Sequence, residues 1–362
     1  MRVVFFGTPS FAVPSFEALR QAGVEVVAAV SQPDRPRGRS HSTLLPCPVK
    51  AAAMASGVPI FTPDNPRDPD FMAALALLAP DLGVVVAYGH LLRPALLAIP
   101  RLGLVNVHAS LLPRWRGAAP IHWAIKSGDA ETGVSIMRVE AGLDSGAVWH
   151  QRSIAIGAGD TTGMLFERLA TLGAEALIEA LPRIAAGEQP VPQDESRATH
   201  APKIDRAMAR IDWTMPVAEV SAQIRAMDPA PGAWTTVAGR DVKLFYNNRE
   251  RSKVKGEPAD STVSPFTFHD GTTPGTERTE TPISGHGETS KVKGEPADST
   301  VSPLTFHLGT PPGTIQPHDG LLIAACSDGW LPLGEVTPAG GKRMPALTWY
   351  RGAQLPDGAA FQ

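Results

Sequence analysis

The sequence predicts an α/β domain built on a parallel β-sheet, followed by a small β-barrel domain. Continuous apolar runs alternate with helix-length segments through roughly the first two hundred residues, which is typical of parallel strands buried on both faces. Beyond residue 205 the apolar runs become short and are separated by glycine and proline turns, as in small barrels. A length of 362 residues suits two domains.

In the first domain, each expected strand is a short apolar run. These runs are Val3–Phe6, Val24–Val30, Leu82–Ala87, Leu104–His108 and Gly133–Val139. Helical spacing of apolar residues predicts helices at Phe11–Ala22, Val49–Ala55, Phe71–Leu78 and Thr161–Ala186. Right-handed crossovers bring the carboxyl ends of parallel strands to one edge, where such Rossmann-like sheets bind ligands.

The second domain is expected after a polar, proline-punctuated linker at residues 188–204. The first domain then spans residues 1–187 and the second spans residues 205–362. In the second domain a short helix precedes four strands, namely Val217–Met227 and then Ala233–Val237, Val242–Tyr246, Leu321–Ala325 and Trp330–Val336. Short strands with frequent turns favour a small barrel of the OB type.

A near-identical repeat interrupts the second domain. Residues 252–276 and 290–314 differ at three of 25 positions, which indicates a recent duplication. The segment 252–314 holds 8 glycines, 8 prolines and 19 serines plus threonines, and it lacks tyrosine, tryptophan and methionine. This composition buries too little apolar surface to offset the entropy lost on ordering. We therefore expect a low-complexity, mobile loop between two barrel strands.

Composition excludes several classes of protein. A hydrophobic content of 43% and a charged content of 19% argue against wholesale disorder, and no stretch predicts a membrane span. The net charge of −3 equals that of segment 252–314, so the rest of the chain is neutral. Cys47 and Cys326 form no paired motif, which argues against a zinc site or a disulfide framework. Because no signal-peptide pattern is present, we expect a cytoplasmic protein.

The densest group of polar residues lies at the end of the expected strand Leu104–His108. Asn106 and His108 are two residues apart, so their side chains share one face of the strand. Polar side chains at the end of an apolar strand are costly unless they have partners, and parallel sheets place their sites at this edge. Either residue alone is more often structural, whereas the pair favours a functional site.

A carboxylate, Asp144, lies in the glycine-flanked loop Glu140–Gly146. Taken alone, it is more often a turn former. A histidine serves as a general acid or base near neutral pH, and a carboxylate orients it. An asparagine amide donates to a developing oxyanion. Because no nucleophilic serine or cysteine accompanies these three residues, they indicate direct group transfer without a covalent enzyme intermediate.

Two other signals are weaker. The run Gly7–Pro9 lacks the remaining glycines of the G-x-G-x-x-G fingerprint, which argues against a dinucleotide site. The arginine-rich loop 34–39 is either a solvated surface loop or a phosphate contact. Arg114 and Arg116 likewise either steer phosphates or form surface ion pairs.

Long motifs make the chain resemble the methionyl-tRNA formyltransferase family, a branch of the 10-formyltetrahydrofolate-dependent transformylases. The matching runs are Phe6–Pro9, Gln32–Pro36, Gly38–Arg39, Val84–Gly89, Asn106–Ile121, Thr132–Met137, Gly142–Gly146, Arg210–Trp213 and Pro338–Lys342. The run Asn106–Ile121 is the most specific of them. The resemblance covers nearly the whole chain outside residues 252–311.

This resemblance implies an enzyme that transfers a formyl group from 10-formyltetrahydrofolate to the methionine amino group of initiator methionyl-tRNA. Asn106, His108 and Asp144 match the catalytic trio of the family, which works without a metal. The first domain is then the catalytic formyltransferase domain, and the second is the tRNA-binding domain. We expect a monomer with no membrane partner.

The resemblance also implies binding residues. The segment that lines the folate site of the family matches Ser110, Leu111, Leu112 and Pro113. Arg39 matches the key arginine of a loop that reaches toward the tRNA acceptor stem. Relatives commonly continue that loop with lysines, whereas this chain has Ser40–Thr43, which points to a weaker or pH-sensitive tRNA contact.

Other functions stay open at this point. A folate-dependent formyltransferase acting on a small amine shares the trio but usually lacks the second domain. A formyltetrahydrofolate hydrolase or dehydrogenase module uses water as acceptor. A non-enzymatic RNA-binding protein on the same fold is a different class, and the intact trio argues against it.

Overall fold

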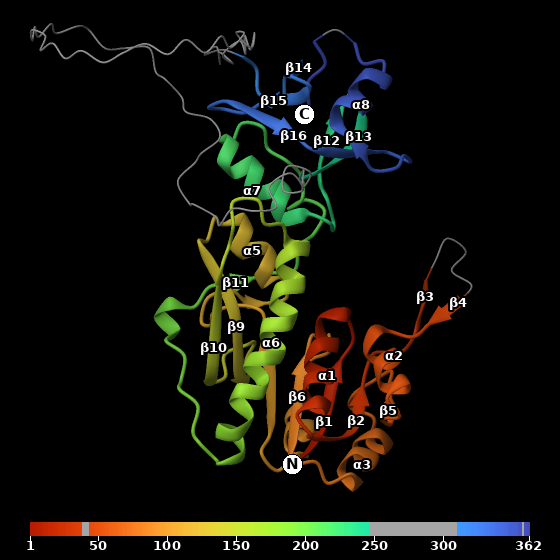
Figure 1. Ribbon diagram of the computed structural model, residues 1–362, viewed down its shortest axis with the longest axis vertical. Coiled ribbons are helices and arrows are strands. Elements are labelled where there is room, and N and C mark those ends of the chain that lie inside the picture. Colours follow the sequence, from red (N-terminus) through yellow and green to blue (C-terminus); the bar gives the residue numbers. More distant parts are fainter. Residues whose placement is uncertain (38–42, 247–309, 357) are drawn as a thin grey trace, which may run out of the picture. The chain divides into compact units, whose positions relative to one another are not determined.

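The computed structural model describes residues 1–37, 43–246, 310–356 and 358–362 (Figure 1). The strands of the main sheet in the first domain are β1 (Arg2–Gly7), β2 (Glu25–Val30), β5 (Ile60–Phe61), β6 (Leu82–Val86), β7 (Leu104–His108), β9 (Glu131–Arg138) and β10 (Val148–Ala155). The helices are the 3₁₀ turn η1 (Ser10–Ala12), α1 (Val13–Gln21), α2 (Pro48–Ala55), α3 (Pro69–Leu77), α4 (Pro94–Leu97), α5 (Pro120–Lys126) and α6 (Thr162–Ala185).

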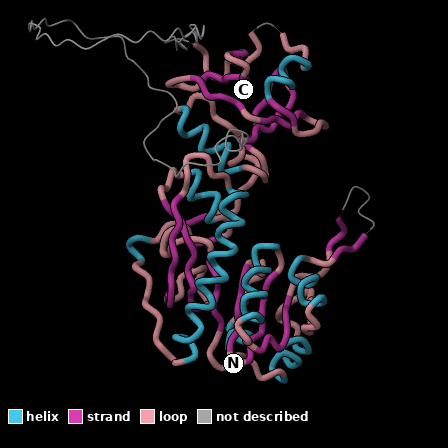
Figure 2. Tube along the Cα trace, in the orientation of Figure 1, coloured by secondary structure: helices cyan, strands magenta, loops and turns pink. Residues whose placement is uncertain are grey.

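The main sheet has the strand order β10-β9-β7-β6-β1-β2-β5. The neighbouring strands β7, β6, β1, β2 and β5 pair in parallel, in that order across the sheet. Strand β9 is antiparallel to both β7 and β10. Figure 2 shows the helices of this domain lying alongside the strands. The expected α/β class with a parallel-dominated sheet is confirmed, and the two added antiparallel pairings lie at one edge.

Strand β1 shows that the sheet is buried on both faces. Val3 and Phe5 join a core that includes apolar residues of α1 and α6. Val4 and Phe6 join a separate core that includes residues of α3 and α4. All four side chains are fully buried. This follows from the alternation of side chains along a strand, and it explains why the sequence shows a continuous apolar run.

Two short strand pairings lie outside the main sheet. β3 (Arg35–Arg37) and β4 (Thr43–Leu45) form an antiparallel hairpin. β8 (Arg116–Gly117) pairs in parallel with β11 (His200–Ala201), after a 3₁₀ turn η2 (Glu195–Arg197). The second of these pairings ties the expected linker to the loop that follows β7.

The second domain contains α7 (Val217–Met227), β12 (Ala233–Val237), β13 (Arg240–Phe245), β14 (Ile315–His318), β15 (Leu321–Ala325), β16 (Trp330–Leu333), β17 (Glu335–Pro338), β18 (Met344–Pro345) and α8 (Ala346–Gly352). Its described strands form two antiparallel sheets, β12-β13-β17-β18 and β14-β15-β16. Trp213 stacks on Phe361 at a centroid distance of 5.1 Å inside this domain. An antiparallel domain of small strands is therefore confirmed.

Some expected elements differ from those observed. The expected single strand 330–336 is two strands, β16 and β17, separated by Gly334. Strand β16 pairs with β15, whereas β17 pairs with β13 in the other sheet. The sequence analysis does not predict strand β10, an edge strand in which polar residues such as Gln151 and Ser153 are exposed and interrupt any apolar run. Of the expected mobile loop 252–314, residues 252–309 lie outside the described residues. Residues 310–314 are described, and Gly313 donates its N–H to the carbonyl oxygen of Ala325 at 2.8 Å.

None of the helices in the described ranges is long and apolar enough to cross a membrane. Both cysteines are buried and unpaired.

Candidate active site

The carboxyl end of β7 places Asn106 and His108 side by side along one face of the sheet. Val105 and Val107 point into the core with α1 and α6, whereas Leu104 points into the opposite core. Asn106 and His108 therefore share the face of Leu104, as the spacing predicts. Asn106 is half-buried, and its amide has no hydrogen-bond partner within the described part of the chain. This amide is available to a substrate.

His108 is held from both sides. Only 5% of its surface is exposed. Its Nε2 lies 2.9 Å from the carbonyl oxygen of Trp115, to which it donates because a carbonyl only accepts. Its Nδ1 faces Asp144, with 3.7 Å to Oδ2. The structure thus brings the expected histidine and carboxylate together.

Asp144 lies in the loop between β9 and β10, in a left-handed conformation with φ of 47°. Its Oδ2 accepts a hydrogen bond from the backbone N–H of Gly117 at 2.9 Å. Gly146 allows the loop to close, because a Cβ at this position would overlap the backbone oxygen of Arg138. One carboxylate oxygen is therefore fixed between the loop after β7 and the ring of His108.

The segment expected at the folate site is a tightly bonded turn. The Ser110 hydroxyl donates to the carbonyl of Arg114 at 2.6 Å, and Ser135 bonds both Ser110 and Leu112. Ser110 and Leu112 are buried, while Leu111 and Pro113 are half-buried. The hydroxyl of Ser110 is thus already engaged, and the outer residues Leu111 and Pro113 are the ones able to contact a ligand. Folate binding by these four residues stays a prediction.

Arg39, the predicted tRNA contact, lies outside the described residues. Next to it the hairpin of β3 and β4 is described, and Leu44 is 63% exposed on β4. Near its base, Lys50 forms an ion pair with Asp34 at 2.6 Å. Lys50 is therefore already paired to a carboxylate.

Arg114 and Arg116 both form ion pairs, and their environments differ. Arg114 binds Asp129 through two hydrogen bonds and stacks on the Trp115 ring at 4.3 Å. Arg116 is only 5% exposed and pairs with Glu195 at 2.7 Å. Hydrogen bonding to Glu195 is the largest cause that raises the pKa of Arg116, and the charge of Asp144 adds to it.

Two residues of the segment after α6 contact the loops that hold His108 and Asp144, and the sequence analysis did not predict them. Gln193 donates to the carbonyls of Asp144 and Gly146, and Thr199 accepts from the N–H of Trp115. Both residues fall in the stretch expected to be a linker, whose polar composition gives no signal of such contacts.

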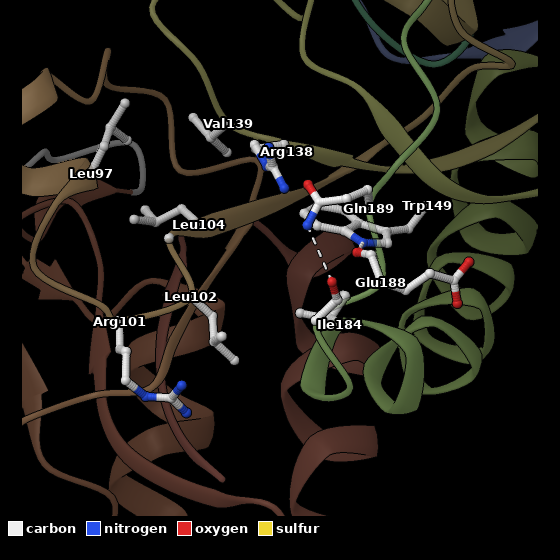
Figure 3. A pocket seen from close by; sticks show the side chains of 12 residues that line it. Leu97, Arg101, Leu102, Leu104, Arg138, Val139, Trp149, Ile184, Glu188 and Gln189 are labelled. Carbon is white, nitrogen blue, oxygen red and sulfur yellow. Dashed lines mark hydrogen bonds between the residues drawn. The ribbon is translucent and has the colours of Figure 1, made fainter.

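A cavity of about 270 Å³ lies elsewhere on the domain, at the amino end of β7 (Figure 3). Its lining includes Arg138, which stacks on Trp149 at 5.1 Å, together with Gly103 and Leu104. Asn106 and His108 are not among its lining residues, so this cavity is separate from the candidate site. In the described ranges, no group of three or more histidine, cysteine or carboxylate side chains is placed to hold a metal ion.

Comparison with known proteins identifies the relatives of this fold. Residues 1–181 match the family described as formyl transferase, and residues 203–281 and 286–354 match the formyl transferase C-terminal domain. Methionyl-tRNA formyltransferase of Xanthomonas axonopodis pv. citri (strain 306) is 52% identical over 246 residues, covering 67% of this chain and 80% of the relative. The enzyme of the same name from Ruegeria pomeroyi is 47% identical over 265 residues, covering 73% and 87%.

Two solved structures share the fold at low sequence identity. The N-formyltransferase from Helicobacter canadensis, in complex with folinic acid and dTDP-3-aminofucose, has a TM-score of 0.58 at 13% identity and covers 94% of this chain and 99% of that chain. HypX from Aquifex aeolicus, in complex with tetrahydrofolic acid, has a TM-score of 0.58 at 17% identity and covers 98% of this chain but 48% of that chain. The resemblance read from the sequence motifs is confirmed: this chain belongs to the methionyl-tRNA formyltransferase family.

Proposed function

We propose that this protein transfers the formyl group of 10-formyltetrahydrofolate to the free amino group of initiator methionyl-tRNA, yielding N-formylmethionyl-tRNA for translation initiation. The observation that carries the proposal is sequence identity of 47–52% to methionyl-tRNA formyltransferases over 67–73% of the chain, with formyl transferase family matches in both domains. The convergence of Asn106, His108 and Asp144 at one sheet edge supports it, because these groups suit direct formyl transfer.

The reaction needs a polarised formyl carbon and a path for one proton. The neutral amine of methionine attacks the formyl carbon, and the carbonyl oxygen becomes an oxyanion. The free amide of Asn106 and the Nδ1–H of protonated His108 donate to that oxyanion. The C–N bond to the amine forms, the bond to the folate nitrogen breaks, and the proton lost by the amine passes to the folate nitrogen.

Asp144 holds the ring of His108 in place. Because Nε2 of His108 is committed to the Trp115 carbonyl, Nδ1 is the nitrogen that faces Asp144 and the reacting atoms. A carboxylate there orients the ring and accepts the proton in transit. The N–H of Gly117 fixes the same carboxylate oxygen, so its position does not depend on the substrate.

The second domain provides the tRNA-binding surface in this proposal, with residues 1–187 as the catalytic domain. Arg206 and Arg210 both lie over the ring of Trp234, at 4.2 and 5.5 Å. Cations beside an aromatic ring suit phosphates and bases together. Outside segment 252–314 the charges in this domain are balanced, so a tRNA contact depends on local grouping of this kind. Arg39 adds a contact from the first domain.

We further propose that the enzyme acts as a monomer in the cytoplasm. The three groups assigned to the reaction, Asn106, His108 and Asp144, come together within one chain.

The test is an acceptor comparison with 10-formyltetrahydrofolate as donor. Methionyl-tRNA should be formylated, whereas glycinamide ribonucleotide and a reaction without acceptor should give neither formylated product nor accelerated donor loss. Methionyl-tRNA that carries an N-acetyl group is the matched control, because it lacks only the attacking amine. Formylation of the small amine, or hydrolysis without acceptor, would replace the proposed function with one of those activities.

A further inference from the structure

The segment from Val191 to Ala201 runs along the catalytic loops and bonds to them at successive points. Val191 exchanges two backbone hydrogen bonds with Val148, the first residue after the Asp144 loop. Further along, β11 pairs with β8, the strand that contains Gly117. A flexible spacer between domains would make few such bonds, so this stretch has a structural role in the first domain.

Gln193 is the centre of this contact. Its amide Nε2 donates to the carbonyl of Asp144 at 2.8 Å and to that of Gly146 at 2.7 Å. Its Oε1 accepts from Nε and Nη2 of Arg116 at 3.0 and 2.8 Å. Both amide hydrogens and both lone pairs of oxygen are therefore used. A glutamate of nearly the same size would keep the bonds to Arg116 but would set a carboxylate against two carbonyl oxygens.

Arg116 makes this arrangement rigid. Its buried guanidinium binds Gln193 on one side and Glu195 on the other, so both partners from the segment are fixed to the loop after β7. The next residue, Gly117, donates to the Asp144 carboxylate. Asp144 is thus held by its side chain from Gly117 and by its main chain from Gln193.

The same segment also sets the backbone that holds His108. Thr199 Oγ1 accepts from the N–H of Trp115 at 2.9 Å, and the Thr199 carbonyl accepts from Arg116 N–H at 2.9 Å. Trp115 has a φ of 64°, a conformation that a bulky residue rarely adopts without support. In this conformation its carbonyl receives the Nε2–H of His108.

We propose that Gln193 is a positioning residue for formyl transfer: it holds the Asp144 loop at the distance from His108 that the reaction needs. This inference rests on the proposed function for its kinetic readout. Gln193 touches no reacting atom, so its removal should lower kcat and leave substrate binding nearly intact. A misplacement of about 1 Å at a catalytic group costs roughly 100-fold in rate.

The test compares Gln193→Glu and Gln193→Ala with Gln189→Ala. Gln189 is a suitable control because it lies just before this segment, is exposed and, within the described part of the chain, hydrogen-bonds through its side chain to Gly187 alone. We expect Gln193→Glu to lower kcat by roughly 10- to 100-fold with KM for both substrates changed less than about 3-fold. Gln193→Ala should show a smaller loss in the same direction, and the control should match the wild type.

Hydrogen exchange gives a readout that does not depend on the substrate. The amides of residues 142–147 should exchange faster in both Gln193 variants than in the Gln189 variant. Wild-type kcat in Gln193→Glu would overturn the proposal, and so would unchanged exchange in this loop. If Gln193→Glu fails to fold, Gln193→Ala decides the same questions. A wild-type protein that formylates no methionyl-tRNA would overturn the proposed function instead, while exchange still reports whether Gln193 holds the loop.

Discussion

The carbonyl oxygen of Trp115 lies 2.9 Å from Nε2 of His108, which commits this ring nitrogen within the protein itself. A carbonyl has no hydrogen to give, so Nε2 carries one in either charge state of the ring. Proton exchange by His108 is therefore confined to Nδ1, the nitrogen that faces Asp144. The main chain of the loop after β7 thus decides which nitrogen takes part in the chemistry.

The first prediction concerns the carboxylate. Asp144→Asn keeps an oxygen that accepts from Gly117 but removes the negative charge beside His108. We expect turnover to fall by roughly two decades or more, because the imidazolium and the proton path both lose their partner. Tetrahydrofolate affinity, measured by equilibrium binding, should change little. Turnover near that of the wild type would refute the role assigned to Asp144.

The second prediction concerns the oxyanion. Asn106→Ala removes the amide that has no partner in the described part of the chain, so folding stability should hardly change. The loss of one oxyanion donor is worth roughly 100- to 1000-fold in turnover. Steady-state kinetics and thermal unfolding measured together separate the two effects. A large fall in the unfolding midpoint with little loss of turnover would show that Asn106 is structural.

Much of the first domain is predictable because its strands are buried on both faces. The apolar runs at Val3–Phe6 and Leu82–Ala87 are continuous, and their observed bounds agree within one residue. Strand β10 cannot be predicted in this way because it lies at an edge of the sheet. There Arg152 forms an ion pair with Glu175 of α6 on the surface. A strand that is buried on one face only has polar residues between its apolar ones, so its sequence shows no continuous apolar run.

The candidate site was predictable only in part, for a similar reason. Strand geometry alone predicts that Asn106 and His108 share a face. Nothing local predicts that Gln193, 49 residues beyond Asp144, bonds its carbonyl, since a glutamine in a polar stretch has no periodic pattern. Contacts between distant loops depend on tertiary structure, and the sequence pattern does not encode them visibly.

The third prediction concerns the closure of the Asp144 loop. In Gly146→Ala the new methyl group would meet the backbone oxygen of Arg138, which cannot move without disturbing β9. We expect a loss of about 1–3 kcal/mol in stability, in line with overpacking, together with reduced kcat. Gly352→Ala is the control, because a Cβ there meets no atom within 4 Å. Equal denaturation midpoints for the two variants would contradict the predicted clash.

The fourth prediction concerns pH. Burial lowers the pKa of His122, and its hydrogen bond to the carbonyl of Ala230 opposes this only in part. The unfolded chain then binds a proton more readily than the folded one, so stability is fully present above the unfolded pKa and declines as pH falls below it. The midpoint of thermal unfolding should drop from pH 8 to pH 5 by less in His122→Gln than in the wild type. The exposed His200→Gln variant should keep the wild-type dependence, and an identical drop in both variants would argue against His122 as the cause.

The fifth prediction concerns the duplicated segment. Deleting residues 252–311 removes the segment's charge of −3 while keeping Gly313, whose N–H and carbonyl bond Ala325 and Phe361. We expect wild-type kcat, and a somewhat tighter complex with tRNA at low salt, because repulsion of the phosphates is reduced. The two proteins should converge in affinity at high salt, where the charge is screened. Binding isotherms across a salt series test this, and weaker binding or a shallower salt slope in the deletion variant would show that the segment itself contacts the tRNA.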